Sequence, residues 1–387
     1  MIVEATTSAD VRNAVRTARE RRLPFTVFAT GHGGAIPTRD DSGNDIVVAR
    51  VSDMGGVLVD QDRRTAWVGP GTVWGDVIAA AAPFGLAPLS GTSPTVGVIG
   101  YTLGGGMGWL SRRFGFAADS VVRAEVVTAD GELRTVDADH DADLFWALRG
   151  AGANFGAVTG LEFRLHPVAS VYAGVATFAP ERAADVLAWY GANAATLPDE
   201  LTANIVLTAD SLAVRGMYAG SAQDARSALA PLFRVAGTPR TDGWRTMSYT
   251  ESGTVGGTAP RHFNLVRDLS GAAVTATLTA VATDATTVEV RHWGGALARP
   301  AADAGPIGHR DVPFSVVVDG PTNHLAPHAT GGGFLNWLHD PTQVHTAYTA
   351  ADHARLRDLK LAYDPENVFR PTKHIAPATR VAAQVGA

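Results

Sequence analysis

The sequence contains no cysteine, which excludes disulfide bonds, thiolate metal sites and thiol nucleophiles. It has no basic run and no acidic tail, and its formal net charge is only −6, so its charge pattern does not predict a nucleic-acid surface. No uncharged apolar stretch approaches the ~20 residues that cross a bilayer, and the acidic Glu4 stands where a signal peptide would be basic. We therefore expect a cytoplasmic protein without nucleic-acid or membrane partners, as a monomer or small homo-oligomer.

Glycine, by contrast, is abundant, and its distribution is the first informative feature of the chain. There are 42 glycines among 387 residues, and many of them fall in clusters. The 46% hydrophobic and 18% charged residues are typical of a globular protein rather than a disordered one. A chain of this length predicts about two domains.

The first 167 residues mix helical and strand patterns. Capping residues and apolar spacing predict helices over 8–22, 74–82 and 144–148. Short apolar runs predict strands over 25–29, 45–51, 64–68, 121–128, 133–136 and 158–165. Pro167 closes this first domain.

The pattern of expected helices and strands changes after Pro167. Strands are expected over 171–178, 202–207, 213–218, 274–282 and 314–318, and helices over 183–195, 222–232 and 286–297. This pattern is typical of an α+β domain with a mainly antiparallel sheet covered by helices. From a helix expected over 350–361 onward, the sequence pattern again resembles that of the first domain. We predict a first domain over 1–167, a second over 168–350 and a C-terminal return to the first over 351–387.

The glycine cluster from Gly104 to Gly108 fits neither common phosphate-binding motif. A Rossmann fingerprint needs Gly-x-Gly-x-x-Gly between a strand and a helix, with an acidic residue ~20 positions on. A P-loop needs a Lys-Ser/Thr pair, which is absent here. What remains is a run of bare backbone N–H groups that can approach a pyrophosphate or a flat ring closely.

Several stretches taken together resemble the FAD-binding domain of PCMH type found in the vanillyl-alcohol-oxidase superfamily. They are Thr30-Gly-His-Gly-Gly, 91–115, Ala118-Asp-Ser-Val and 143–159. The C-terminal stretches 294–299, 334–337 and 355–370 resemble the berberine bridge enzyme-like branch of that superfamily. The resemblance implies an FAD-dependent oxidoreductase with a two-part FAD-binding domain and an α+β substrate domain. Its substrate would be a small organic molecule, such as a natural-product intermediate or a sugar.

The resemblance also implies which residues bind FAD, and all of them lie in or beside the glycine-rich loops and their C-terminal counterpart. They are Thr30, Gly31, His32, Gly33, Gly34, Gly91, Thr92, Ser93, Thr95, Val96, Gly97, Gly100, Gly104, Gly105, Gly106, Gly108, Trp109, Asp119, Asn154, Gly156, Val158 and Asn367.

His32 stands where relatives carry a histidine bonded to the 8-methyl carbon of the flavin. The resemblance therefore implies a covalent FAD, although a histidine that only hydrogen-bonds in its loop is the alternative. Many relatives have a second tether, a cysteine, at the position of Ser93, so double attachment is excluded here. Val96 stands at a position that influences oxygen access, and a valine there usually goes with oxidases that use O2.

The expected catalytic base is missing. Several relatives use a tyrosine that ends an aromatic-x-Asn-Tyr motif, whereas this chain ends the motif with Trp337. An indole N–H donates a hydrogen bond and cannot accept a proton. We place Trp337, Asn336 and His339 at the catalytic site, with Asn336 bonding either substrate, flavin or only protein.

Histidines are frequent in the same region and are candidates for the base near neutral pH. They are His309, His324, His328, His339 and His345. His324 and His328 have the spacing of a zinc helix, but the nearby Pro321 and Pro327 oppose a continuous helix, so we predict no metal.

Three functions remain open from the sequence. The first is an FAD-dependent oxidase with O2 as acceptor. The second is a dehydrogenase that passes electrons to another carrier. The third is an enzyme of this fold that catalyses a non-redox step, such as a cyclisation, with FAD in a structural role.

Overall fold

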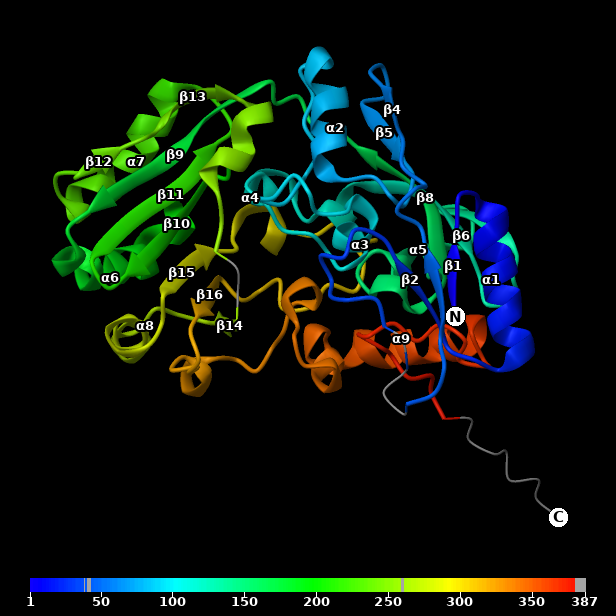
Figure 1. Cartoon of the computed structure of the whole chain (residues 1–387). Helices are drawn as coiled ribbons and strands as arrows, with labels where there is room; N and C mark the ends of the chain where they lie inside the picture. The colour runs from blue at the N-terminus through cyan, green and yellow to red at the C-terminus, as the bar shows by residue number, and fades with distance from the viewer. Residues whose placement is uncertain (38, 40–42, 259–260, 380–387) are drawn as a thin grey trace.

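The computed structural model describes residues 1–37, 39, 43–258 and 261–379, and these residues form three sheets. Two smaller sheets lie at the right of Figure 1, and the largest lies at the left. The predicted α+β class, with mainly antiparallel sheets, is confirmed.

The smallest sheet is parallel and holds the N-terminus. Its order is β1 (Ile2–Glu4), β3 (Val47–Arg50) and β2 (Phe25–Phe28). Helix α1 (Ser8–Arg21) begins with a capping box between Thr7 and Asp10 and buries its apolar face against this sheet.

The second sheet is antiparallel and has five strands. They are β4 (Val57–Asp60), β5 (Thr65–Val68), β8 (Ala157–Arg164), β6 (Val121–Val127) and β7 (Leu133–Asp137), in that order. The helices of this part of the chain are α2 (Trp74–Ala81), α3 (Val98–Leu103), α4 (Ser111–Phe114) and α5 (Ala142–Leu148). The segment between α2 and β6 contains the long glycine-rich loop.

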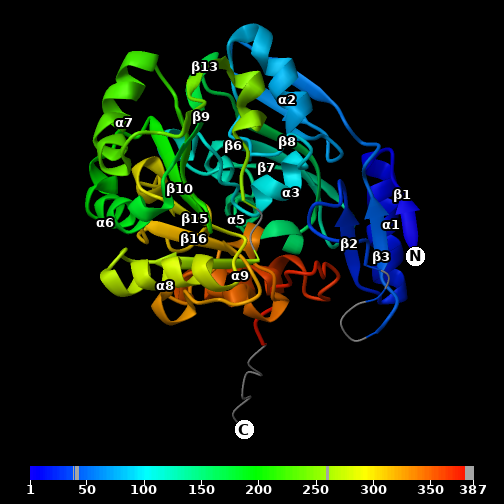
Figure 2. The ribbon, with the colours of Figure 1, turned by 60° about the vertical axis from the view of Figure 1, so that its left-hand side comes forward.

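The largest sheet has eight strands, all paired antiparallel. They are β12 (Thr241–Asp242), β9 (Ser170–Phe178), β11 (Ser211–Tyr218), β10 (Leu201–Thr208), β15 (Thr287–His292), β16 (Phe314–Asp319) and β14 (His262–Val266), with β13 (Arg245–Ser248) beside β9. Helices α6 (Ala183–Asn193), α7 (Ala222–Ala236) and α8 (Gly271–Thr283) pack their apolar side chains against one face of it, as Figure 2 shows for α6 and α7. The other face lies toward the rest of the molecule.

Two sequence predictions in this domain are wrong. Residues 274–282, expected as a strand, lie in helix α8, and residues 286–297, expected as a helix, contain strand β15. In α8, alternating Thr and Val imitate a strand, but the buried Ala273, Val274, Thr277 and Ala280 have helical spacing. In β15, Glu289 and Arg291 suggest a solvated helix face, yet both are buried.

Helix α9 (Ala350–Tyr363) carries the chain back to the N-terminal part, and the shorter strands β1, β4, β12, β13 and β14 are additions that the sequence did not predict. Lys360 of α9 is fully buried and donates to Asp364 at 2.6 Å and to the carbonyls of Asn154 and Phe369. The predicted boundary at 350/351 stays a prediction, but side chains from Leu335 onward already pack with α5 and β8. Residues 380–387 of the predicted return lie outside the described residues. Among the helices described, none is long and apolar enough to cross a membrane.

Candidate functional site

His32 and Ser93 meet through a single hydroxyl group. Nε2 of His32 lies 3.0 Å from Oγ1 of Thr95, and the same Oγ1 lies 3.0 Å from Oγ of Ser93. The two loops also touch at their bases, because a β-carbon on Gly97 would lie 3.0 Å from the side chain of Thr30. The structure thus brings together the loops that the sequence assigned to the flavin.

Many of the predicted cofactor glycines are required by the protein's own atoms. A β-carbon on Gly106 would lie 2.4 Å from the ring of Tyr101, and one on Gly91 would lie 3.0 Å from the same ring. One on Gly108 would lie 1.9 Å from the carbonyl oxygen of Ser90. These glycines let the loop fold tightly around Tyr101, so their first role is packing.

Three other predicted glycines have a different environment. Among the described residues, nothing lies within 4 Å of a β-carbon added at Gly33, Gly34 or Gly100. Gly100 is exposed in the middle of helix α3, where glycine costs about 1 kcal/mol relative to alanine. Bare backbone beside the His32 loop, kept at this cost, fits a flat ring or a phosphate that must come close.

A buried hydroxyl adds to this fit. The phenol oxygen of Tyr101 is buried, with no hydrogen-bond partner in the part of the chain that the structure describes. Burial raises the pKa of this phenol well above its ordinary value, and the nearby Arg291 cation opposes that shift only in part. Tyr101 is therefore a hydrogen-bond donor at neutral pH and not a base. Nε1 of the buried Trp109 is likewise without a partner among the described groups.

The other predicted contacts of this set lie close by. Thr92 packs against Gly257 of the second domain, where a β-carbon would lie 2.6 Å from its Oγ1. Val96 is half-buried and touches the core beneath the five-stranded sheet. Gly31 has φ of +83°, which favours glycine at the turn before His32.

The Phe-Leu-Asn-Trp motif closes over the glycine loop. Asn336 donates from Nδ2 to the carbonyl of Tyr101 at 3.0 Å and accepts at Oδ1 from the N–H of Gly106 at 2.9 Å. The amide of Asn336 occupies the space that a side chain at position 104 would need, and Phe334 occupies the corresponding space at Gly105. Asn336 therefore fixes the loop through its side chain, and its direct part in catalysis stays a prediction.

Lys373 holds the motif from behind. Its ammonium group donates to the carbonyls of Leu335 and Asn336, and burial lowers the pKa of Lys373 to about 8. His339, the third predicted catalytic residue, is exposed just beyond the motif.

Asn154, predicted to bind the cofactor, has a structural role in the described protein. It is fully buried, donates to the carbonyls of Ala151 and Lys373, and accepts from the N–H of Ile375 at 2.8 Å. The amide ties the C-terminal tail to the loop after α5, and its contact with the cofactor stays a prediction.

Asp119, also predicted to bind the cofactor, forms a partly buried ion pair. Both carboxylate oxygens accept from Arg310, at 2.9 and 2.7 Å, and one also accepts from the N–H of Phe116. Since Arg310 belongs to the second domain, this ion pair joins the two domains.

Three further predicted contacts are packing or turn residues. Gly156 lies against β6, where a β-carbon would be 2.4 Å from Val126, and Val158 is buried in the core of the same sheet. Asn367 has φ of +53° and bonds His374, so it shapes the turn after α9. In the described protein these three residues serve packing and turn formation, and their contact with the cofactor stays a prediction.

The sequence missed a charged cluster on the open face of the eight-stranded sheet. Glu289 and Arg291 of β15 lie beside Asn204 of β10 and Arg215 of β11. The guanidinium of Arg291 lies 4.7 Å from the ring centroid of Trp337, so the cluster borders the predicted catalytic motif. No signal in the sequence identified it, because isolated Glu and Arg are normally surface residues.

The histidines of 309–345 are scattered rather than gathered at this motif. His309 bonds the carbonyl of Thr346 at 2.7 Å, and His324 bonds Thr283 at the end of α8. His328 ends only a short 3-10 turn, as the neighbouring prolines predicted. Within the described ranges no group of three or more potential metal ligands occurs.

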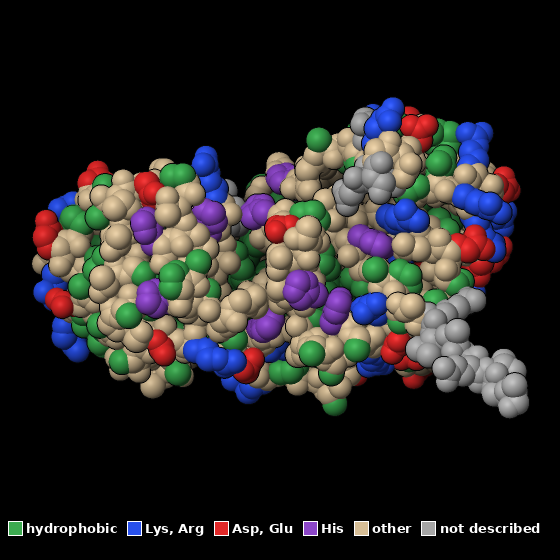
Figure 3. All heavy atoms as spheres, turned by 90° about the horizontal axis from the view of Figure 1, so that it is seen from below, with side chains coloured by type: hydrophobic (Ala, Val, Ile, Leu, Met, Phe, Trp, Pro, Cys, Tyr) green, Lys and Arg blue, Asp and Glu red, His purple; other side chains and the backbone are tan. Residues whose placement is uncertain are grey.

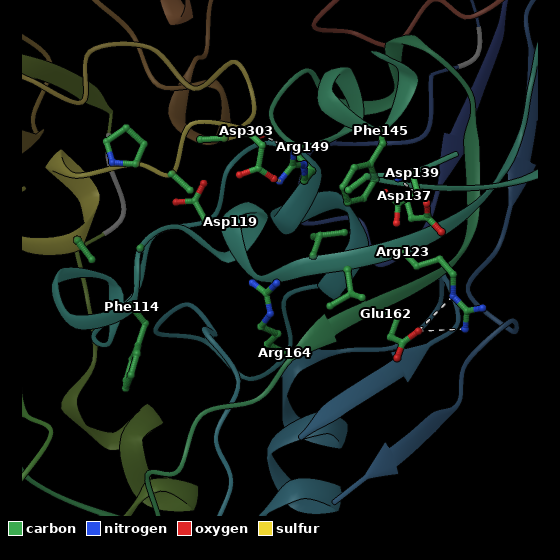
Figure 4. A pocket seen from close by; sticks show the side chains of 18 of the residues that line it. Phe114, Asp119, Arg123, Asp137, Asp139, Phe145, Arg149, Glu162, Arg164 and Asp303 are labelled. Atoms are coloured by element: carbon green, nitrogen blue, oxygen red, sulfur yellow. Dashed lines mark hydrogen bonds and ion pairs between the residues drawn. The ribbon is translucent and has the colours of Figure 1, made fainter. Parts of the chain in front are cut away.

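A cavity of about 710 Å³ lies elsewhere, between strands β6 and β8 and the segment 296–304 (Figure 4). Some of its charged residues pair with one another: Glu162 with Arg123, and Arg149 with Asp303. Of the predicted cofactor residues only Asp119 lines it, so we do not assign the flavin to this cavity.

Comparison with known proteins decides the family. A model described as FAD binding domain matches residues 1–137, and one described as berberine and berberine like matches residues 333–376. The chain is 29% identical over 420 residues to YgaK of Bacillus subtilis (strain 168), described as an uncharacterized FAD-linked oxidoreductase, covering 98% of this chain and 92% of that protein. Residues 1–137 therefore belong to the FAD binding domain family and residues 333–376 to the berberine-like family, and the chain is an FAD-linked oxidoreductase.

Two further relatives of this oxidoreductase have named activities. It is 36% identical over 181 residues to (R)-6-hydroxynicotine oxidase of Paenarthrobacter nicotinovorans, covering 46% of this chain and 39% of that enzyme. A solved chitooligosaccharide oxidase superposes with a TM-score of 0.83 at 23% identity, covering 98% of this chain and 92% of that one, which shows the fold. FAD is the cofactor of this oxidoreductase.

Proposed function

We propose that this FAD-dependent oxidoreductase is an oxidase that acts on a small organic molecule and uses O2 as electron acceptor. The observation that carries the proposal is the junction of His32, Thr95 and Ser93 beside the open glycines of the two loops. Bound there, FAD supplies the hydride acceptor, its N5 atom, for oxidation of an alcohol or amine. Val96 and the two oxidases among the similar proteins support O2 as acceptor.

The junction favours a single covalent tether at His32. Thr95 engages Nε2 of the imidazole, so the other ring nitrogen, Nδ1, is left to bond the 8-methyl carbon. Ser93 stands in the same hydrogen-bonded chain, but a hydroxyl is not a thiolate, and the chain has no cysteine for a second bond. Thr95 would hold the imidazole in the orientation that attachment needs.

A test of the tether follows the yellow colour after acid denaturation. In the wild type we expect the flavin to precipitate with the protein, and in His32→Ala we expect it to stay in the supernatant. Thr95→Ala should slow attachment without preventing FAD binding. Flavin released from the wild type would refute the tether, and a colourless native protein would refute the function.

A second measurement separates oxidase from the alternatives. The flavin is reduced photochemically under argon, mixed with air-saturated buffer, and its absorbance is followed by stopped flow. Reoxidation within seconds supports the oxidase. Reoxidation over many minutes favours a dehydrogenase, and turnover of a substrate that never bleaches the flavin favours a non-redox step. Cytoplasmic location and oligomeric state stay predictions from the sequence.

A further inference from the structure

The eight-stranded sheet has two faces of opposite character. Its helix-covered face is apolar, with Ile205, Val214 and Val290 side by side on adjacent strands. The neighbouring positions point the other way, and there Asn204 stands directly opposite Arg215. Seen from below, the surface is hollowed between the lobe that carries this sheet and the rest of the molecule (Figure 3).

Glu289 lies at the centre of the polar face and is saturated with donors. Its carboxylate accepts from Nδ2 of Asn204 at 2.6 Å, from the N–H of Thr258 at 3.1 Å, and from Arg291 and Arg215 at 3.0 and 3.5 Å. Burial alone would raise its pKa, but Arg291 and these hydrogen bonds outweigh burial and hold the pKa below its ordinary value. Glu289 is therefore a fixed anion that positions the arginines, and it is not the missing base.

The two arginines are not neutralised by this one carboxylate. The cluster of Arg215, Arg291 and Glu289 has a formal charge of +1. The arginine side chains are 18% and 10% exposed while that of Glu289 is 1% exposed, so the cations are more accessible than the anion. Within the described part of the chain, the buried Nε of Arg215 has no acceptor, and the buried hydroxyl of Thr202 is also without a partner.

A partly buried cation pair with a net charge of +1 and an unused buried donor on Arg215 calls for an anion. We propose, on the basis of the oxidase function above, that Arg291 and Arg215 bind a carboxylate group of the substrate. A carboxylate carries one negative charge and so neutralises the cluster, whereas a phosphate monoester would carry about −1.5 to −2 and leave buried negative charge. The planar fork of a guanidinium also matches the two oxygens of a carboxylate.

The place of the cluster defines the rest of the substrate. Arg291 stacks on Trp337, whose ring centroid also lies 5.1 Å from that of Phe263, and it lies close enough to Tyr101 to influence that phenol. Trp337 and Tyr101 border the glycine loop of the predicted flavin site. A carboxylate held here leaves the remainder of a small molecule to reach the flavin, so the substrate class is an acid that also bears a hydroxyl or an amine.

The test uses the purified holoenzyme and three probes of one shape: benzoate, benzamide and phenyl phosphate. Binding is followed by the change in flavin absorbance and independently by the rise in melting temperature. We expect benzoate to bind at least tenfold more tightly than benzamide, and phenyl phosphate to bind no better than benzamide. Equal binding of benzoate and benzamide overturns the proposal.

Two single variants and the double variant that combines them then test whether the carboxylate binds at this cluster. Arg291→Gln should weaken benzoate binding about 10- to 100-fold, the usual worth of hydrogen bonds to a charged partner. Glu289→Gln should strengthen it, and the double variant, which restores the net charge of +1, should recover part of the loss. Arg267→Gln removes an arginine from an exposed ion pair with Asp311 and should change nothing.

These outcomes remain informative if one variant does not fold. Should Arg291→Gln fail to fold, the double variant avoids a buried carboxylate that has only Arg215 as its cation, and it carries the comparison with the wild type. Unchanged benzoate affinity in either variant overturns the assignment to Arg291. A protein that purifies without flavin refutes the proposed oxidase, yet its melting temperature still reports carboxylate binding. A flavoprotein that ignores benzoate refutes only this inference.

Discussion

The open glycine of helix α3 offers a sharp test of where the flavin lies. A β-carbon at Gly100 meets nothing within 4 Å among the described residues, and its backbone is in an ordinary helical conformation. The flavin-free protein should therefore gain stability from Gly100→Ala, by about 0.5–1 kcal/mol, since alanine loses less backbone entropy in a helix. If FAD occupies that space, the same methyl group should oppose its binding.

The expected loss of affinity can be estimated from overpacking. Forcing one methyl group into filled space costs about 1–3 kcal/mol, which corresponds to roughly 5- to 150-fold in Kd. The measurement needs reversible binding. The proteins with glycine and with alanine at position 100 are therefore compared in a His32→Ala background after the flavin has been removed. FAD is titrated back by fluorescence quenching, and the stability of the flavin-free protein is measured by urea unfolding.

Two control variants make the result specific. Gly271 begins helix α8 of the second domain and also has nothing within 4 Å of an added β-carbon in the described structure, so Gly271→Ala should leave FAD affinity unchanged. Gly108→Ala would place its methyl group 1.9 Å from the Ser90 carbonyl and should prevent folding with or without flavin. Unchanged FAD affinity in Gly100→Ala would refute the view that the cofactor lies against α3.

Two further predictions concern stability. Lys360→Ala leaves Asp364 charged and fully buried without its cation, so it should lower the free energy of unfolding by about 3–5 kcal/mol in urea titrations; a loss below about 1 kcal/mol would contradict this account. Burial, aided by Arg112, lowers the pKa of His292 to about 3, so between pH 6.5 and 3 the unfolded chain binds the proton and the folded one does not. The free energy of unfolding should therefore fall as the pH drops through this window, by about 1.4 kcal/mol for each pH unit. His292→Gln should make the fall shallower, whereas parallel curves for the two proteins would exclude His292 as a cause.

The sequence predicts cofactor loops because glycine clusters and their spacing are local properties, and the match of residues 1–137 to an FAD binding domain supports the cofactor. It does not reveal which glycines face the flavin. Gly106 and Gly100 cannot be distinguished in the sequence. In the described protein, Gly106 makes room for the ring of Tyr101, whereas no atom occupies the space beside Gly100. That distinction depends on how the loop folds around Tyr101, which the sequence does not show.

Distant partners explain both the structural roles of Asn154 and Asp119 that the sequence does not indicate and the error on strand β15. Asn154 and Asp119 lie in family motifs, but their partners are Ile375 and Arg310, which are far away in the chain. Strand β15 was missed because charged residues at alternate positions indicate a solvated surface, and only the partner strand supplies the Asn204 amide that makes a buried Glu289 stable. Such pairing is tertiary, and one sequence does not contain a signal for it.

Trp337 gains a different meaning from its surroundings. In the sequence, Trp337 stands where several relatives have the tyrosine that acts as the base. The absence of that base is the reason to consider a non-redox enzyme. In the structure its ring carries the guanidinium of Arg291, and tryptophan is the side chain whose face attracts a cation most strongly. The indole thus supports an anion-binding group at the substrate side of the flavin loops. Because this role is compatible with flavin oxidation, the tryptophan no longer favours a non-redox step. The proton acceptor must then be sought among groups that the substrate itself brings close, and a substrate held by its carboxylate at Arg291 fixes where to look.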